Sequence, residues 1–277
     1  MLTGECDELR IVYSGKCSAA ENMAFDEAIL DYVVEEEPEA AVGWLRLYGW
    51  EKPTVSFGRF QRPKREVDLE KARELGMDLV KRPTGGKALV HDDEVTYCVI
   101  LPAKSPLAKC SIAESHRRLA DGLARALKSF GLDVSVGKPE SSGKRGATVP
   151  CFAEHLAESV LIDNKKVAGS AQFRRKGGVL QHGSILRSLD YKLHEELFGR
   201  AAKGFARKAV GLKALLPKAP SVEELSCAVA EGMAAVVSAG NKRIIDNVPA
   251  WILDRTRRLC AEKYSRLDWS ARREEGQ

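Results

Sequence analysis

The sequence lacks the features that mark membrane-spanning, secreted and disulfide-rich proteins. No apolar run approaches the roughly 20 residues that a membrane-spanning helix needs. The N-terminal stretch MLTGECDE contains neither the basic nor the apolar region of a signal peptide. The seven cysteines are odd in number, scattered along the chain and without a C-x-x-C pair. We therefore expect reduced thiols in the cytoplasm, without a disulfide framework or a zinc site.

Three further absences argue against a metal site, a Walker phosphate loop and nucleic-acid binding. The five histidines form no H-x-x-x-H or similar ligand pair, so we expect no metal. Residues 84–87 read TGGK, but Lys81 stands where a Walker phosphate loop needs its first glycine, so no such loop is predicted. The net charge of +5 is mild, and no array of basic residues alternates with aromatic ones. We therefore expect no nucleic-acid partner.

What is present is the composition of an ordinary globular protein. The chain has 277 residues, 44% hydrophobic and 30% charged, which suits one large domain or two small ones with a full core. Hydrophobic periodicity and turn signals predict a mixture of strands and helices, whose order indicates an α/β or α+β fold. The predicted strands cover 8–13, 43–49, 54–58, 80–92 and 94–101, and the predicted helices cover 18–35, 67–76, 113–131, 190–213, 222–238 and 249–263.

The segment 150–186 combines residues suited to acyl transfer. It begins with Cys151 at the end of a Gly- and Ser-rich loop, and Lys166 follows fifteen residues later. Small-residue turns at 168–171 and 183–184 allow backbone to approach a substrate. A thiol, a nearby cation and such turns suit a reaction through a thioester. The structural alternative is that Cys151 is a small buried hydrophobe and that Lys166 lies in a solvated hairpin.

Two features of the N-terminal half also suggest ligand contact. Gly85 and Gly86 interrupt the strand-like run 80–92, and glycine inside a strand usually indicates a bulge or a ligand close to the backbone. Arg59 follows the predicted strand 54–58. It suits binding of a carboxylate or phosphate, or it is a surface charge.

Several segments together resemble the lipoate/biotin protein ligase superfamily, in particular its cysteine-dependent octanoyltransferases of the LipM type. The resemblance covers nearly the whole chain and depends on the order and number of the motifs. The segments are ENMAFDEA at 21–28, PTVSFGRFQ at 53–61, KRPTGGKALVHD at 81–92, EVTY at 94–97, KVAGSAQ at 166–172 and QHGSIL at 181–186.

The subfamily assignment depends on fewer residues. Cys151-Phe152 stands where these octanoyltransferases carry their nucleophile, and the HDDEVTY form at 91–97 is similar to theirs. The chain differs from the family pattern at Lys87, at Cys98 and at 154–156, where an aromatic residue near Cys151 is missing.

The resemblance implies a fold of mixed sheets flanked by helices. We expect a catalytic domain over 1–241 and a C-terminal helical extension over 242–277. The implied reaction moves octanoyl from acyl carrier protein to Cys151, and then to a lysine of a lipoyl domain or of a glycine-cleavage-type carrier protein. It needs no cofactor. Lys166 would lower the pKa of the thiol and stabilise the oxyanion.

The resemblance also implies a substrate-binding set, in which the Gly85-Gly86 backbone walls an apolar acyl tunnel. For the two histidines it leaves open whether they shape the pocket or move protons. The residues of the set are Arg82, Thr84, Gly85, Gly86, His91, Gly169, Ser170, Ala171 and His182.

Three alternatives remain open at this point. An ATP-dependent lipoate-protein ligase would use Lys166 on an acyl-adenylate and leave Cys151 idle. An amidotransferase would move octanoyl or lipoyl between carrier proteins through the same cysteine. A non-catalytic acyl-binding subunit would keep only the fold, and the presence of both Cys151 and Lys166 argues against it.

Overall fold

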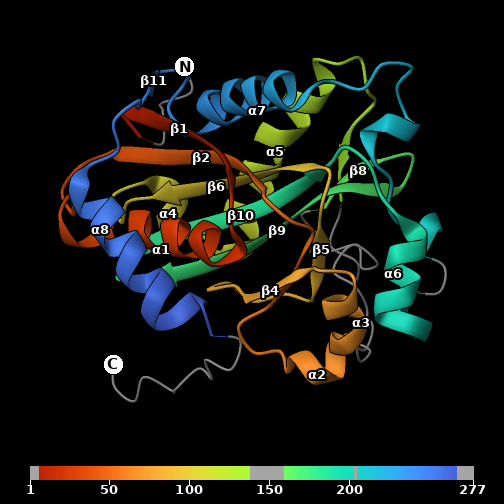
Figure 1. Cartoon of the computed structure of the whole chain (residues 1–277). Helices are drawn as coiled ribbons and strands as arrows, with labels where there is room; N and C mark the ends of the chain where they lie inside the picture. Colours follow the sequence, from red (N-terminus) through yellow and green to blue (C-terminus); the bar gives the residue numbers. More distant parts are fainter. Residues whose placement is uncertain (1–5, 138–158, 203–204, 267–277) are drawn as a thin grey trace.

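The computed structural model describes residues 6–137, 159–202 and 205–266, and it contains two sheets in this part of the chain (Figure 1). The larger sheet has eight strands in the order β11-β1-β2-β6-β10-β9-β8-β7, and the smaller has the order β4-β3-β5. The strands are β1 Glu8–Cys17, β2 Val42–Trp50, β3 Thr54–Phe57, β4 Asp78–Lys81, β5 Leu89–His91, β6 Glu94–Leu101, β7 Ser135–Val136, β8 Val160–Ile162, β9 Lys165–Arg175, β10 Gly178–Leu186 and β11 Lys242–Ile244.

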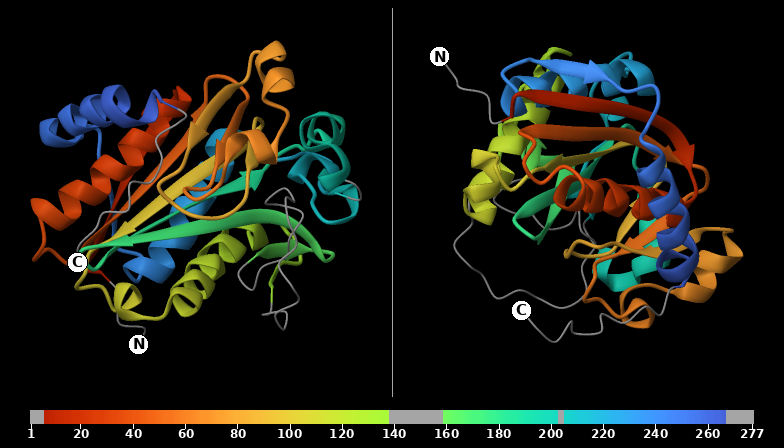
Figure 2. Two further views of the ribbon diagram at one scale, coloured as in Figure 1. Left: turned by 90° about the horizontal axis from the view of Figure 1, so that it is seen from below. Right: turned by 90° about the vertical axis from the view of Figure 1, so that its left-hand side faces the viewer.

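Helices cover both faces of the larger sheet (Figure 2). Helices α5 and α7 bury their apolar stripes on one face, and α1 and α8 bury theirs on the other. Helices α3 and α6 pack with the smaller sheet around a third core. The helices are α1 Ala19–Glu35, α2 Pro63–Glu66, α3 Leu69–Glu74, α4 Pro106–Lys109, α5 Ile112–Lys128, α6 Tyr191–Phe198, α7 Val222–Val237 and α8 Ala250–Leu259. Mixed sheets with flanking helices confirm the predicted fold class.

Local signals placed several helix ends correctly. Ser18 and Glu21 form the predicted capping box, in which the Ser18 side chain accepts from the Glu21 backbone and Glu21 accepts from the Ser18 backbone. Helix α1 ends at Glu35, as the following acidic run predicts. The predicted helix over 190–213 is mostly wrong, because Gly199 (φ +54°) ends α6 and only short 3-10 turns follow.

Strands β2 and β3 are close in sequence but lie in different sheets. Strand β2 pairs with β1 and β6, whereas β3 pairs with β4 and β5. The short turn at 51–53 therefore carries the chain from one sheet to the other. This step positions the smaller sheet, and the glycine-rich turn between β4 and β5, beside β9 and β10.

The segment after residue 241 packs on the rest of the fold. Strand β11 adds to the edge of the larger sheet beside β1, and α8 lies along α1. At its end, Lys263 and Tyr264 both contact the buried Glu27 carboxylate of α1. Burial alone would raise the pKa of Glu27, but Lys263, Tyr264 and Arg175 hold it below its usual value. None of the described helices is both long and apolar enough to cross a bilayer.

Helices α5 and α7 touch through two glycines. A methyl group on Gly232 would lie 2.2 Å from the Gly122 carbonyl oxygen. Helix propensity alone favours alanine over glycine by about 1 kcal/mol, but there is no space for the added carbon. The close helix contact therefore requires glycine at this position.

We expect Gly232→Ala to lower the free energy of unfolding by about 1–3 kcal/mol, the usual cost of overpacking. Urea denaturation measures this change. Glu231→Ala, at an exposed position of the same helix, is the control and should be close to neutral. A stabilised Gly232→Ala variant would contradict the proposed close contact.

Candidate active site

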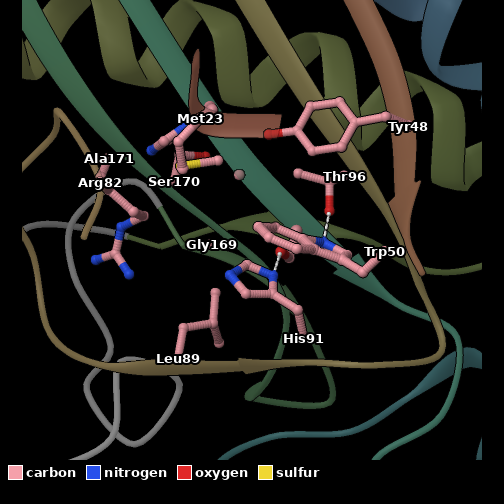
Figure 3. Close-up of a pocket in the computed structure, with 13 residues that line it drawn as sticks. Met23, Tyr48, Trp50, Arg82, Leu89, His91, Thr96, Gly169, Ser170 and Ala171 are labelled. Carbon is pink, nitrogen blue, oxygen red and sulfur yellow. Dashed lines mark hydrogen bonds between the residues drawn. The ribbon is translucent and has the colours of Figure 1, made fainter. Parts of the chain in front are cut away.

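A pocket lies between the smaller sheet and strands β9 and β10 (Figure 3). One part of its wall is apolar, from α1, β2 and β5, and the other is backbone and polar side chains of β9 and β10. It gathers six of the residues predicted to bind substrate. The lining residues are Met23, Tyr48, Trp50, Arg82, Leu89, His91, Thr96, Gly169, Ser170, Ala171, His182, Gly183 and Ser184.

The predicted glycine-rich turn supports this wall. Gly86 has a φ of +91°, which favours glycine, and a Cβ there would lie 3.3 Å from the Arg82 guanidinium. A Cβ on Gly58, at the end of β3, would lie 2.0 Å from the Gly86 carbonyl oxygen. The turn is therefore packed against Arg82 and against the end of β3. Arg82 adds hydrogen bonds to the carbonyl oxygens of Gly85 and Lys87.

A first buried hydrogen-bond chain connects α1 to this turn. Asp26 accepts from the guanidinium of Arg46 (2.9 Å) and from the Tyr48 hydroxyl (2.8 Å). His182 Nδ1 lies 3.2 Å from Asp26 Oδ2, and His182 Nε2 lies 2.7 Å from the Thr84 hydroxyl. Because Nδ1–H of His182 donates a hydrogen bond to the Asp26 carboxylate, Nε2 of a neutral His182 accepts from the Thr84 hydroxyl.

The pKa shifts of the groups in this hydrogen-bond chain support a neutral His182. Burial would raise the pKa of Asp26, but His182, Arg46 and Tyr48 hold it below its usual value. Burial lowers the pKa of His182, although the Asp26 carboxylate acts in the opposite direction. At neutral pH this hydrogen-bond chain therefore contains an ionised Asp26 carboxylate and a neutral His182 imidazole. Burial and the Asp26 charge raise the pKa of the Tyr48 hydroxyl well above its ordinary value, so Tyr48 remains a donor.

A second chain has the same order of groups. Glu94 Oε1 lies 2.6 Å from His91 Nδ1, and His91 Nε2 lies 2.6 Å from the Ser56 hydroxyl. Ser56 in turn accepts from Arg82 (2.7 Å). Since both ring nitrogens of His91 and His182 are used in these contacts, the geometry favours a positioning role for both histidines over proton transfer to substrate.

Sequence reasoning missed several residues of these chains. Glu94 Oε1 also accepts from Thr96 (2.7 Å), Ser184 (2.7 Å) and the Trp50 indole (3.2 Å). The Trp50 ring stacks on His91, with centroids 4.1 Å apart. A sequence signal was available for the two acids, because Asp26 and Glu94 lie inside segments that resemble the superfamily. Their partners are distant in sequence and carried no local signal.

Lys166 is almost completely buried, with 1% of its surface exposed, and it is not among the residues that line the pocket. A β-bulge determines the face of the sheet on which it lies. Residues 160 and 161 of β8 pair with 168 and 166 of β9, so Val167 is the extra residue. Val160 and Ile162 face the core under α5 and α7, which places Leu161 and its partner Lys166 on the opposite face. That face also carries Ala171 of the pocket.

The other predicted residues are placed less completely. Cys151 lies outside the described residues, as does the loop predicted to precede it. Lys165, which precedes Lys166 in β9, is partly exposed. Among the described residues, no cluster of three or more His, Cys, Asp or Glu side chains could hold a metal ion.

A sequence model of the lipoyl protein ligase A/B catalytic domain matches residues 18–234. The chain belongs to this family. Among similar family members, the protein named octanoyltransferase LipM from Kyrpidia tusciae is 39% identical over 245 residues, which cover 83% of this chain and 87% of that protein. The Bacillus subtilis protein of the same name is 32% identical over 277 residues, covering 95% and 98%.

Solved structures of the family share the fold. The lipoate protein ligase from Thermoplasma acidophilum gives a TM-score of 0.75 at 22% identity, over 95% of this chain and 96% of that one. Lipoate-protein ligase A bound with ATP gives a TM-score of 0.77 at 21% identity, over 96% and 98%. At this identity the similarity establishes the fold alone.

We expect Asp26→Asn to lower the free energy of unfolding at pH 7 by about 3–5 kcal/mol, because it leaves the buried Arg46 charge without its carboxylate. The pKa of Asp26 is lower in the folded than in the unfolded protein. Its carboxylate therefore contributes fully to the free energy of unfolding above about pH 4, the pKa of an unfolded aspartate, and this contribution is lost as the pH falls through the folded-state pKa. The difference between wild type and Asp26→Asn should therefore shrink below about pH 4.

Urea denaturation between pH 3 and 7 measures this effect. Glu39→Gln, which changes an exposed acid, is the control. It should leave the fall in the free energy of unfolding at acid pH unchanged. If Asp26→Asn does not fold, Tyr48→Phe tests the same chain, with an expected loss of about 1 kcal/mol. A constant difference between Asp26→Asn and wild type at all pH values would contradict the ionised state of Asp26.

Proposed function

We propose that the protein is an octanoyltransferase that acts in lipoate biosynthesis through a cysteine thioester. The observation that supports this most strongly is family membership together with relatives, 31–39% identical over most of the chain, that are named octanoyltransferase. The proposed donor is octanoyl-acyl carrier protein. The proposed acceptor is a lysine of a lipoyl domain or of a glycine-cleavage-type carrier protein.

The shape of the pocket supports an acyl substrate. Met23, Tyr48, Trp50 and Leu89 contribute apolar surface to its wall, and the remaining lining residues are the glycine-containing segments of β9 and β10 and the side chains of Arg82, His91 and Thr96. Each buried methylene contributes about 0.8 kcal/mol, so an octanoyl tail gains roughly 5 kcal/mol without an ionic contact. An acyl tail carries no charge to pair with, which fits a pocket whose neighbouring charged groups are paired with one another.

The proposed reaction has two steps. The Cys151 thiol loses its proton and the thiolate attacks the thioester carbonyl of the donor. The bond from that carbon to the carrier sulfur breaks, and the carrier thiolate leaves and takes up the proton that Cys151 lost. A deprotonated acceptor amine then attacks the acyl-Cys151 carbonyl, forms the amide and releases the Cys151 thiol. Lys166, a buried cation on the pocket face, is proposed to stabilise the thiolate and the oxyanion of both steps.

We expect Lys166→Ala to reduce acyl transfer at least about a hundredfold, because oxyanion stabilisation of this kind is typically worth that much. Its Cys151 thiol should also react more slowly with iodoacetamide at pH 7, with a midpoint moved to higher pH. Steady-state kinetics and alkylation across pH measure the two effects.

Lys165→Ala is the matched control, because the neighbouring side chain lies on the other face of the same strand. It should retain near-normal transfer and alkylation. If the two lysine variants behave alike, the role proposed for Lys166 is wrong.

Cys151 should become acylated when the protein is mixed with octanoyl-acyl carrier protein, with or without ATP and magnesium, because the donor is already a thioester. Intact-protein mass spectrometry should show one octanoyl group on wild type and none on Cys151→Ala. Transfer that requires ATP would instead support the lipoate-protein ligase, and normal transfer by Cys151→Ala would exclude the thioester route.

A further inference from the structure

The loop that follows β3 has an unusual concentration of positive charge. Residues 58–65 read GRFQRPKR, with four cationic residues and no acid. The side chains of Arg62, Lys64 and Arg65 are exposed. Within the described part of the chain, none of these three takes part in an ion pair, whereas exposed cations such as Lys104 and Arg117 do. Arg62, Lys64 and Arg65 are thus exposed to solvent without an ion pair to any described residue, with Glu66 the first acid to follow them in the sequence.

The same loop presents an aromatic ring to solvent. Phe60 is 82% exposed, and the next most exposed large hydrophobic side chain of the described residues, Ile112, reaches 59%. A tight turn holds the loop, in which the Gly58 amide donates to Gln61 Oε1 and the Gln61 amide to the Gly58 carbonyl, both at 2.9 Å. Pro63 then begins helix α2. The ring is thus held outward by ordered backbone.

The loop is attached directly to the active-site wall. The Arg59 amide donates to the carbonyl oxygen of Thr84 (2.8 Å), and Thr84 contacts His182 of the pocket. The Arg59 guanidinium lies 5.5 Å from the ring centroid of Phe173 in β9. Figure 1 shows α2 at the margin of the molecule, next to the smaller sheet that carries this wall. We call residues 58–65, with their exposed cations and Phe60, the basic platform.

We propose that the basic platform is the docking surface for the acyl-carrier domain that delivers the octanoyl thioester. This inference rests on the proposed function. A carrier domain holds its acyl group on an arm attached through a phosphodiester, which is an anion, and the unpaired cations complement that charge. An exposed aromatic ring beside cations provides an apolar anchor for the same partner. The acceptor reacts as an uncharged amine in the proposed second step, so the anionic arm of the donor is the group that these cations complement.

The test compares two variants of equal charge. Arg62→Gln/Lys64→Gln/Arg65→Gln removes the exposed cations of the platform. Its matched control, Lys109→Gln/Arg125→Gln/Lys128→Gln, removes three exposed cations from α4 and α5, on the other side of the molecule. Rapid-quench mass spectrometry measures how fast each is acylated by octanoyl-acyl carrier protein, and Phe60→Ala is measured in parallel.

The platform variant should be acylated at least about tenfold more slowly at low ionic strength, and added salt should reduce its difference from wild type. The control should match wild type. All variants should react equally with octanoyl-N-acetylcysteamine, a small neutral thioester that needs no docking surface. Phe60→Ala should slow acylation by the carrier protein severalfold without the salt dependence.

Equal acylation of the platform variant and the control by the carrier protein would overturn the docking surface. So would a defect confined to transfer from acyl-enzyme to acceptor, because that would assign the surface to the other partner. If neither thioester acylates wild type, the proposed function itself fails. That result is distinct from a docking defect, in which the small thioester still reacts.

Discussion

Two buried carboxylates hold the smaller sheet against the larger one, and the site depends on this attachment. Asp26 and Glu94 each orient a histidine, and the second nitrogen of each histidine is bonded to a hydroxyl of the smaller sheet or of its glycine turn. The two chains therefore determine where the turn at 84–86 lies relative to β9 and β10.

Burying the Asp26–Arg46 ion pair is costly, and hydrogen bonds to both side chains offset part of that cost. Both Asp26 and its partner Arg46 have no exposed side-chain surface. Removing a carboxylate and an ammonium from water costs several kcal/mol each, which attraction offsets only with good geometry and additional hydrogen bonds. Asn22 and Tyr48 supply such bonds to Arg46 and Asp26. A buried hydrogen-bond chain with some of its polar groups unpaired would be less stable than an apolar core, so these residues stabilise the fold only together.

The positive groups around the pocket have distinct physical environments. Arg46 and Arg82 are buried and bonded within the two chains, which makes them part of the frame. Lys166 is also buried, but on the face that leads to the pocket. Arg62, Lys64 and Arg65 are in solvent, where screening weakens their pairwise effects but leaves their long-range attraction for anions. The cations assigned to the framework and to the proposed chemistry are thus buried, and those assigned to the proposed recognition are exposed.

The sequence by itself determined the fold class, the helix α1 with its capping box, and strand β6 over 94–101. It did so because hydrophobic period, caps and glycine are local signals. Superfamily motifs also located Arg82, His91, His182 and the 169–171 backbone, which do line one pocket. Cys151 and the division at 241 stay predictions.

Only the tertiary structure decided the rest. The separation of β2 and β3 into two sheets and the pairing of Asp26 with His182 depend on contacts between residues distant in sequence, and the face on which Lys166 lies depends on the bulge at Val167 in the pairing of β9 with β8. Local patterns cannot specify such contacts, because a side chain's partner is set by how the whole sheet packs.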